Sequence, residues 1–229
     1  MIKLEKMKKL IVIAAALLIG FQANAQLIFN GGYLHATESV TKTTQVAGVS
    51  NIETGANSLD GFYAGAKYRF ALDGITEGLS VAPGANVSFM FGREAGIADA
   101  LDDSRCIEVA VNVPLHVQYL YEITPDFKLE GWAGPTAQIG ILNRAIDGDT
   151  NPTNIYNLYK EIPTSENNLG APIAPRNRFN LFLGLGVGAE IAELVHINVG
   201  YDFGVLNLST DPSCQIFRGL LRVGVGYNF

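Results

Sequence analysis

Apolar and polar residues alternate along most of the chain with a period of two. In the clearest run, residues 107–121, the odd positions are all apolar, whereas the even positions include Glu108, Asn112 and His116. Successive side chains of a β-strand point to opposite faces, so this pattern predicts one strand between two different environments. At about 3.3 Å per residue the strand would be ~50 Å long, far beyond the usual strand of 5–6 residues.

Seven further segments repeat this alternation, which predicts eight strands in total. They lie at residues 27–35, 59–71, 79–92, 127–142, 178–191, 195–206 and 217–229. One face of each strand is apolar, and the other face carries glycine and charge. Short connections (72–78, 124–126 and 192–194) alternate with long ones (37–58, 93–105, 143–177 and 207–215). Short inner turns and long outer loops are typical of outer-membrane barrels, and this order places both termini on the inner side.

The apolar faces carry far more large side chains than the interior of an eight-stranded barrel can hold. Turned outward, the same faces would meet lipid, and the glycine-rich faces would fill a narrow lumen. We therefore predict an all-β fold, an eight-stranded antiparallel transmembrane β-barrel with up-and-down topology. A secreted soluble barrel is the alternative.

Aromatic residues gather toward both ends of the predicted strands, as they do at the two interfaces of a membrane. The inner aromatic band comprises Tyr68, Phe70, Tyr119, Tyr121, Phe127, Tyr227 and Phe229, and the outer aromatic band comprises Phe62, Phe89, Phe91, Phe179, Phe203 and Phe217.

The N-terminus has the three parts of a secretory signal peptide. Four lysines up to Lys9 precede an apolar run from Leu10 to Phe21, and Ala23-Asn24-Ala25 supplies the small residues of a cleavage site. The apolar run is shorter than the ~20 residues that a transmembrane helix needs. We predict a cleaved signal peptide over residues 1–25 and a barrel over 26–229. Met1 and Met7 are both open as the start.

Composition narrows the class of function. Charged residues make up 17% of the 229 residues, against about 25% in an average soluble domain. The formal charge of −6 gives no basic footprint for a nucleic acid. Two Cys and three His fit neither a disulfide scaffold nor a zinc motif. We expect no cofactor, no metal and no nucleic-acid partner.

Charged residues on the polar faces predict a network inside the lumen. Its predicted members are Lys67, Arg69, Glu108, Glu122, Lys128, Glu130, Arg178, Glu190, Asp202, Arg218 and Arg222. Charges in a narrow interior must be paired, which favours a salt-bridged plug. A selectivity ring in an open pore is the alternative.

Three details stay open. The residue types of a hydrolase site are present, namely His116, His196, Glu130, Asp202 and Ser88. No nucleophile among them has a spacing that a known catalytic motif uses, so we expect no catalytic residue. A disulfide between Cys106 and Cys214 would join two outer strand ends across the barrel. Pro83, Pro114 and Pro135 lie within predicted strands, where proline removes a donor, so we expect β-bulges there.

The sequence resembles the small Gram-negative outer-membrane β-barrels of the OmpX type, the OmpA membrane domain and porin-family β-barrel domains. The similarity rests on the last strand with its terminal Phe229, on Val113-Pro114-Leu115 and on Gly134-Pro135. It implies an outer-membrane location, a surrounding bilayer with lipopolysaccharide, and insertion by the barrel assembly machinery, with Tyr227 and Phe229 in the assembly signal. It implies no activity.

These observations predict a structural or surface-interaction protein with a largely plugged lumen. Its polar outer loops, 37–58 and 142–176, would bind an extracellular ligand that the sequence does not identify. A narrow porin-like channel and a lipid-modifying enzyme of the outer membrane are the alternatives.

Overall fold

The computed structural model describes residues 25–46, 49–93, 105–146, 155–163 and 174–229. Residues 1–24 of the predicted signal peptide, and with them the choice between Met1 and Met7, lie outside the described residues. Among the described residues, no helix is long and apolar enough to cross a membrane.

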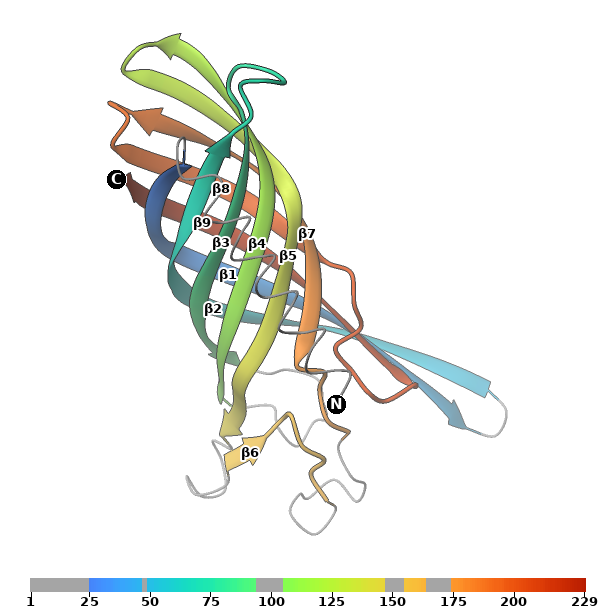
Figure 1. Cartoon of the computed structure of the whole chain (residues 1–229). Coiled ribbons are helices and arrows are strands. Elements are labelled where there is room, and N and C mark those ends of the chain that lie inside the picture. Colours follow the sequence, from blue (N-terminus) through green and yellow to red (C-terminus); the bar gives the residue numbers. More distant parts are fainter. Residues whose placement is uncertain (1–24, 47–48, 94–104, 147–154, 164–173) are drawn as a thin grey trace, which may run out of the picture.

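Eight antiparallel strands close into a ring (Figure 1). The strands are β1 (Ala25–Val46), β2 (Val49–Ala71), β3 (Leu79–Arg93), β4 (Arg105–Thr124), β5 (Phe127–Ile146), β7 (Phe179–Ile191), β8 (Val195–Gly204) and β9 (Cys214–Asn228). Each strand pairs with its neighbour along the chain, and β1 pairs with β9 from Ile28–Asn228 to Lys42–Cys214. The short β6 (Ile155–Asn157) pairs only with the outer end of β5. The predicted fold class is confirmed.

The apolar face of each strand points outward. In β4 the exterior residues Val113, Leu115 and Val117 are about half exposed, whereas Asn112 and Gln118 of the same strand are buried. A closed ring pairs its backbone groups internally, which is the condition for strands to cross a bilayer. The exterior is therefore lipid-facing, and the polar faces form the lumen.

The structure differs from the sequence expectation in its outer parts. Residues 37–58, predicted to be a loop, mostly continue β1 and β2 into a long hairpin that projects beyond the barrel (Figure 1).

The prediction of β-bulges at Pro83, Pro114 and Pro135 is wrong, because the strand register is the same on both sides of each proline. Some residue pairs next to these prolines are missing from the ladder. The strands therefore accommodate the missing N–H donor of proline by losing local pairs, without an extra residue in either strand.

A hydrophobic cluster occupies the outer half of the lumen and includes Leu34, Met90 and Phe182. Leu158 and Ile162, from the segment that follows β6, belong to the same cluster and are buried. This segment therefore packs its apolar side chains onto the lumen contents and covers part of the outer mouth.

Candidate functional site

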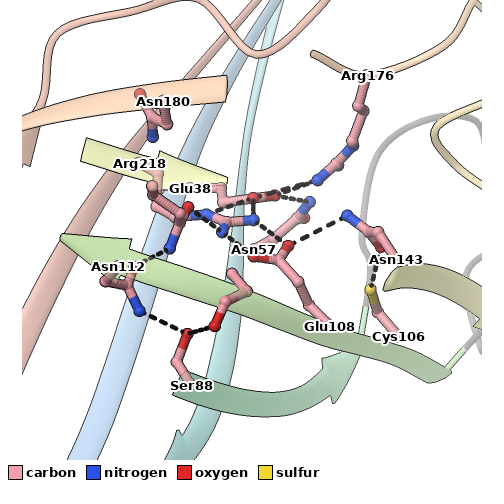
Figure 2. Close-up of polar contacts among 12 residues, drawn as sticks. Glu38, Asn57, Ser88, Cys106, Glu108, Asn112, Asn143, Arg176, Asn180 and Arg218 are labelled. Carbon is pink, nitrogen blue, oxygen red and sulfur yellow. Dashed lines mark hydrogen bonds and ion pairs between the residues drawn. The ribbon is translucent and has the colours of Figure 1, made fainter. Parts of the chain in front are cut away.

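The outer part of the lumen holds a four-residue ionic cluster, which we call the outer cluster: Glu38, Glu108, Arg176 and Arg218 (Figure 2). Arg218 binds Glu108 with two parallel bonds, Nη1 to Oε1 at 2.5 Å and Nη2 to Oε2 at 2.7 Å. Its Nε also donates to Glu38 Oε1 at 3.0 Å. Arg176 Nη1 lies 3.1 Å from both oxygens of Glu38. Two guanidinium groups and two carboxylates thus alternate in one chain of contacts.

Amide side chains complete the surroundings of the outer cluster. Asn143 Nδ2 donates to Glu108 Oε2 at 3.1 Å. Asn112 donates to Asn86 at 3.0 Å and to Ser88 at 2.9 Å, and Gln138 donates to Asn112 at 2.9 Å. Hydrogen bonds of this kind satisfy polar groups that burial would otherwise penalise. Since Arg218 Nη1 also donates to Gln138 Oε1, these amides and the outer cluster form one connected network.

A second group of charges, the inner cluster, lies toward the inner end and comprises Lys67, Arg69, Glu130, Glu190 and His196. Arg69 Nη1 lies 2.5 Å from Glu190 Oε2, and Lys67 Nζ lies 3.8 Å from Glu130 Oε1. His196 Nε2 lies 2.5 Å from Glu130 Oε2. An open vestibule of about 690 Å³ lies on the inner side of this cluster and is bounded by Arg69 and Glu190. The inner cluster forms the floor of that vestibule.

Between the two clusters, Trp132 crosses the lumen. Its ring stacks on His116, with centroids 4.3 Å apart and planes 13° apart. A Cβ atom at Gly186 would lie 2.5 Å from the Trp132 ring, and one at Gly200 would lie 2.2 Å from it. The glycines of β7 and β8 therefore make room for the indole. Beside it, Arg222 Nε donates to Asp202 Oδ2 at 2.5 Å.

The buried charges of the described residues balance. Five cations (Lys67, Arg69, Arg176, Arg218 and Arg222) face five carboxylates (Glu38, Glu108, Glu130, Glu190 and Asp202). Since an unpaired buried charge is strongly destabilising, this balance favours a closed, structural interior.

Eight of the eleven residues predicted for the lumen network are buried there, and three are not. Lys128 lies at the inner rim, where its Nζ is 2.7 Å from Glu193 Oε1. Glu122 is exposed at the inner end and lines the vestibule. Arg178 is exposed at the outer rim, over the ring of Tyr159 at 4.4 Å. The alternation along a strand predicts which face a residue occupies, but it does not predict where along the strand the lumen ends.

Sequence reasoning missed Glu38 and Arg176. Glu38 follows Leu34 and Ala36 on the same face of β1, so extending the alternation past residue 35 would have found it. Arg176 precedes β7 outside any strand, and no periodic signal marks it.

The side chains considered for hydrolysis are not brought into one site. His116 contacts Trp132 and Thr136, whereas His196 contacts Glu130. Ser88 hydrogen-bonds to Asn112 and to the carbonyl of Ala110. In the described part of the chain, no group of three His, Cys, Asp or Glu side chains is placed to hold a metal ion.

The two cysteines and the C-terminal aromatics lie at opposite ends of the barrel. Cys106 and Cys214 are both thiols, and Cys106 Sγ lies 3.2 Å from Asn143 Oδ1. The disulfide that the sequence left open is therefore not formed. Tyr227 and Phe229 face outward with ring centroids 4.7 Å apart. Their role in assembly stays a prediction.

A closed ring of strands with an apolar exterior and a polar, ion-paired interior defines a transmembrane β-barrel of the outer-membrane type. The described strands form such a barrel. No family model matches it, and no curated protein is similar at a significant level.

Among solved structures, the chain is similar to Ail, the attachment invasion locus protein of Yersinia pestis, in complex with the heparin analogue sucrose octasulfate. The identity is 14%, the TM-score 0.42, and the match covers 90% of this chain and 99% of that one. It is also similar to Neisserial surface protein A (16% identity, TM-score 0.37, 88% and 97% covered). A third match is the N-terminal β-barrel domain of OprF from Pseudomonas aeruginosa (12%, 0.35, 87% and 99%). These are Gram-negative outer-membrane barrels, the group that the sequence resembles.

Proposed function

We propose that this protein is a closed outer-membrane barrel that acts as a structural or surface-interaction protein, and neither as an open channel nor as an enzyme. The observation that carries the proposal is the insertion of Arg176 into the outer cluster. Arg176 comes from the segment before β7, and it pairs with Glu38 of β1 inside the lumen. A segment outside the ring of strands therefore contributes to filling the lumen.

The space beside the outer cluster supports closure. The cavity lined by Glu108, Tyr159 and Arg218 has a volume of about 10 Å³. A cavity of ~10–15 Å³ holds at most one water molecule. A hydrated solute would have to separate several buried ion pairs to pass this level. The vestibule at the inner end favours a narrow channel as the second candidate, but it ends at the inner cluster.

Conductance in planar bilayers tests closure. The purified protein should give no stepwise conductance at neutral pH, while a general porin in the same bilayer serves as the positive control. Regular conductance steps from the wild type would contradict the proposal. If such steps occur, Glu108→Gln should change the cation-to-anion selectivity, because a carboxylate at a constriction favours cations.

The projecting hairpin supports the surface-interaction part of the proposal. The last pair between β2 and β3 is Ser58–Arg93, so β2 residues 49–57 have no described strand on that edge. Residues 50–56 of this segment are exposed and include the polar Ser50, Asn51 and Thr54. A strand edge with open hydrogen-bonding groups accepts an extended polypeptide by strand addition. We propose this edge as the contact site for the unidentified extracellular ligand.

A shortened hairpin tests this site. A variant without residues 43–52 keeps the membrane-spanning part of β1 and β2. Bacteria that display the wild type should adhere to immobilised extracellular proteins more strongly than those that display the variant. Equal adhesion, with both barrels folded as judged by heat-modifiable mobility, would exclude the hairpin. We also propose two partners for the barrel wall, which are the barrel assembly machinery and lipopolysaccharide.

A further inference from the structure

Two arginines lie on the outward wall of β4 and β5. Arg105 and Arg144 are both exposed, whereas their neighbours along the chain, Cys106 and Asn143, are buried in the lumen. Because successive side chains of a strand alternate between its faces, the two guanidinium groups point away from the lumen. In the part of the chain that the structure describes, no hydrogen bond or ion pair engages either of them.

The strand register brings the two arginines together. Arg105 pairs with Ile146, and Ile107 pairs with Arg144, so the arginines are diagonal neighbours on one face of the β4–β5 pair. Diagonal neighbours of an antiparallel pair are about 7–8 Å apart, within reach of each other for long side chains. Two like charges at this separation repel each other, and an anion between them would be attracted by both.

A neutral donor lies beside the two charges. The short β6 pairs with the outer end of β5, where Asn157 is the partner of Arg144. Asn157 Oδ1 accepts the backbone N–H of Tyr159, which leaves the Nδ2 group to donate. We call Arg105, Arg144 and Asn157 the arginine patch. Its donors match the oxygens of a phosphate, because a guanidinium group binds two such oxygens in parallel.

The arginine patch lies at the outer boundary of the hydrocarbon. The apolar band of an outer-membrane barrel is about 25 Å tall, and its strands tilt by about 40°. At about 3.3 Å per residue, roughly ten residues of a strand cross this band. Counted along β4 from Tyr119 of the inner aromatic band, the crossing ends at Val109, and Arg105 lies further out. Arg144 lies at the level of Ile107. The arginine patch is therefore at the depth of the outer-leaflet headgroups.

The wall below the arginine patch is apolar. Ile139 and Ile141 of β5 and Val113 of β4 face outward and are about half exposed. Acyl chains of a lipid contact such a wall. A phosphate that is carried by a lipid therefore gains contacts at this site that a free phosphate ion does not.

We propose that the arginine patch binds the phosphomonoester group of an outer-leaflet glycolipid, whose acyl chains lie against the wall below. A phosphomonoester has three acceptor oxygens and a charge between about −1.5 and −2 at neutral pH, so it can accept from both guanidinium groups at once. The inference rests on the proposed lipopolysaccharide partner, and it names the chemical group and the residues that make the contact. The site is separate from the lumen and from the hairpin edge.

Native mass spectrometry of the refolded full-length barrel tests the proposal with two ligands: lipid A, and the same lipid A after enzymatic removal of its phosphates. The phosphorylated form should bind about tenfold more tightly, and an excess of inorganic phosphate should not displace it. Equal affinity for the two forms, or displacement by inorganic phosphate, would overturn the proposal and leave lipopolysaccharide as a partner. If neither form binds, both the proposal and that partner are wrong.

A double variant tests whether the preference comes from the arginine patch. Arg105→Gln combined with Arg144→Gln should reduce the preference to less than about twofold, with the affinity for the dephosphorylated form unchanged. Lys42→Gln combined with Lys128→Gln is the matched control, because it removes the same charge on the hairpin and at the inner rim. A preference retained in the arginine variant, or lost equally in the control, would overturn the assignment. Heat-modifiable mobility verifies that each variant is folded.

Discussion

Arg176 and Glu38 are 138 residues apart in the sequence, yet Arg176 Nη1 lies 3.1 Å from both carboxylate oxygens of Glu38. Because Arg218 also binds Glu38, removal of Arg176 leaves this carboxylate with one cationic partner. We expect Arg176→Gln to lower the free energy of unfolding by about 1–3 kcal/mol, less than the 3–5 kcal/mol for a buried charge left with no partner.

Urea unfolding in lipid vesicles measures this change. Arg144→Gln is the control, because Arg144 is exposed, and its effect should stay within about 0.5 kcal/mol. If both variants lose the same stability, Arg176 does not fasten its segment to the lumen.

Asp202 and Arg222 form an ion pair in the lumen, and both are buried. Asp202→Asn and Arg222→Gln should each destabilise the barrel by about 3–5 kcal/mol, because each leaves a buried charge without its partner. The double variant should lose less than the sum, with a coupling of about 1–3 kcal/mol. A double-mutant cycle in urea measures the coupling, and additive losses would show that the pair is not coupled.

Gly200 leaves no room for a side chain, since a Cβ atom there would lie 2.2 Å from the Trp132 ring. We expect Gly200→Ala to cost about 1–3 kcal/mol through overpacking. Gly131→Ala is a matched control in the strand of Trp132, because nothing lies within 4 Å of its added Cβ. The control should be neutral or slightly stabilising in the same unfolding titration. A larger loss of stability for Gly131→Ala than for Gly200→Ala would contradict the position of the Trp132 ring against Gly200.

Val111 faces the lipid, whereas Thr54 lies on the exposed hairpin. An arginine near the bilayer midplane costs roughly 2–4 kcal/mol in barrels of this kind. Val111→Arg should therefore lose that much in vesicle refolding titrations, and Thr54→Arg should stay within about 0.5 kcal/mol. A cost for Thr54→Arg equal to that for Val111→Arg would contradict the assigned membrane boundary.

The turn between β7 and β8 provides a pH-dependent contact. The hydrogen bond and charge of Lys128 lower the pKa of Glu193 from its ordinary value. The contact therefore stabilises the turn above the ordinary pKa of a glutamate and is lost as the pH falls through the lowered value. An NMR titration of the Glu193 carboxyl should give a pKa below normal in the wild type and a normal one in Lys128→Gln. Identical titrations would refute the contact.

Strand positions and faces were predictable because the period-two pattern reports directly which side of a wall each residue occupies. The positions at which the lumen ends were not predictable from this pattern. Glu122 and Arg178 have the parity of lumen residues, but they lie past the inner and outer ends of the packed interior. Glu38 lies on the buried face of β1 with Leu34 and Ala36, but beyond residue 35, where the predicted strand ended. Arg176 enters from a segment with no periodicity. A charge partner supplied by a non-strand segment leaves no local signal.

The pairing of β1 with β9 joins the beginning of the chain to its end, from Ile28–Asn228 to Lys42–Cys214. Contacts of such large sequence separation form slowly, because the loop entropy is lost before any contact compensates for it. Until β9 has paired with β1, these two strands are both open edges, which favour intermolecular association. The Glu38–Arg218 bond spans the same seam and forms only upon closure. The interval between synthesis and closure is therefore the stage at which this chain depends most on protection from aggregation.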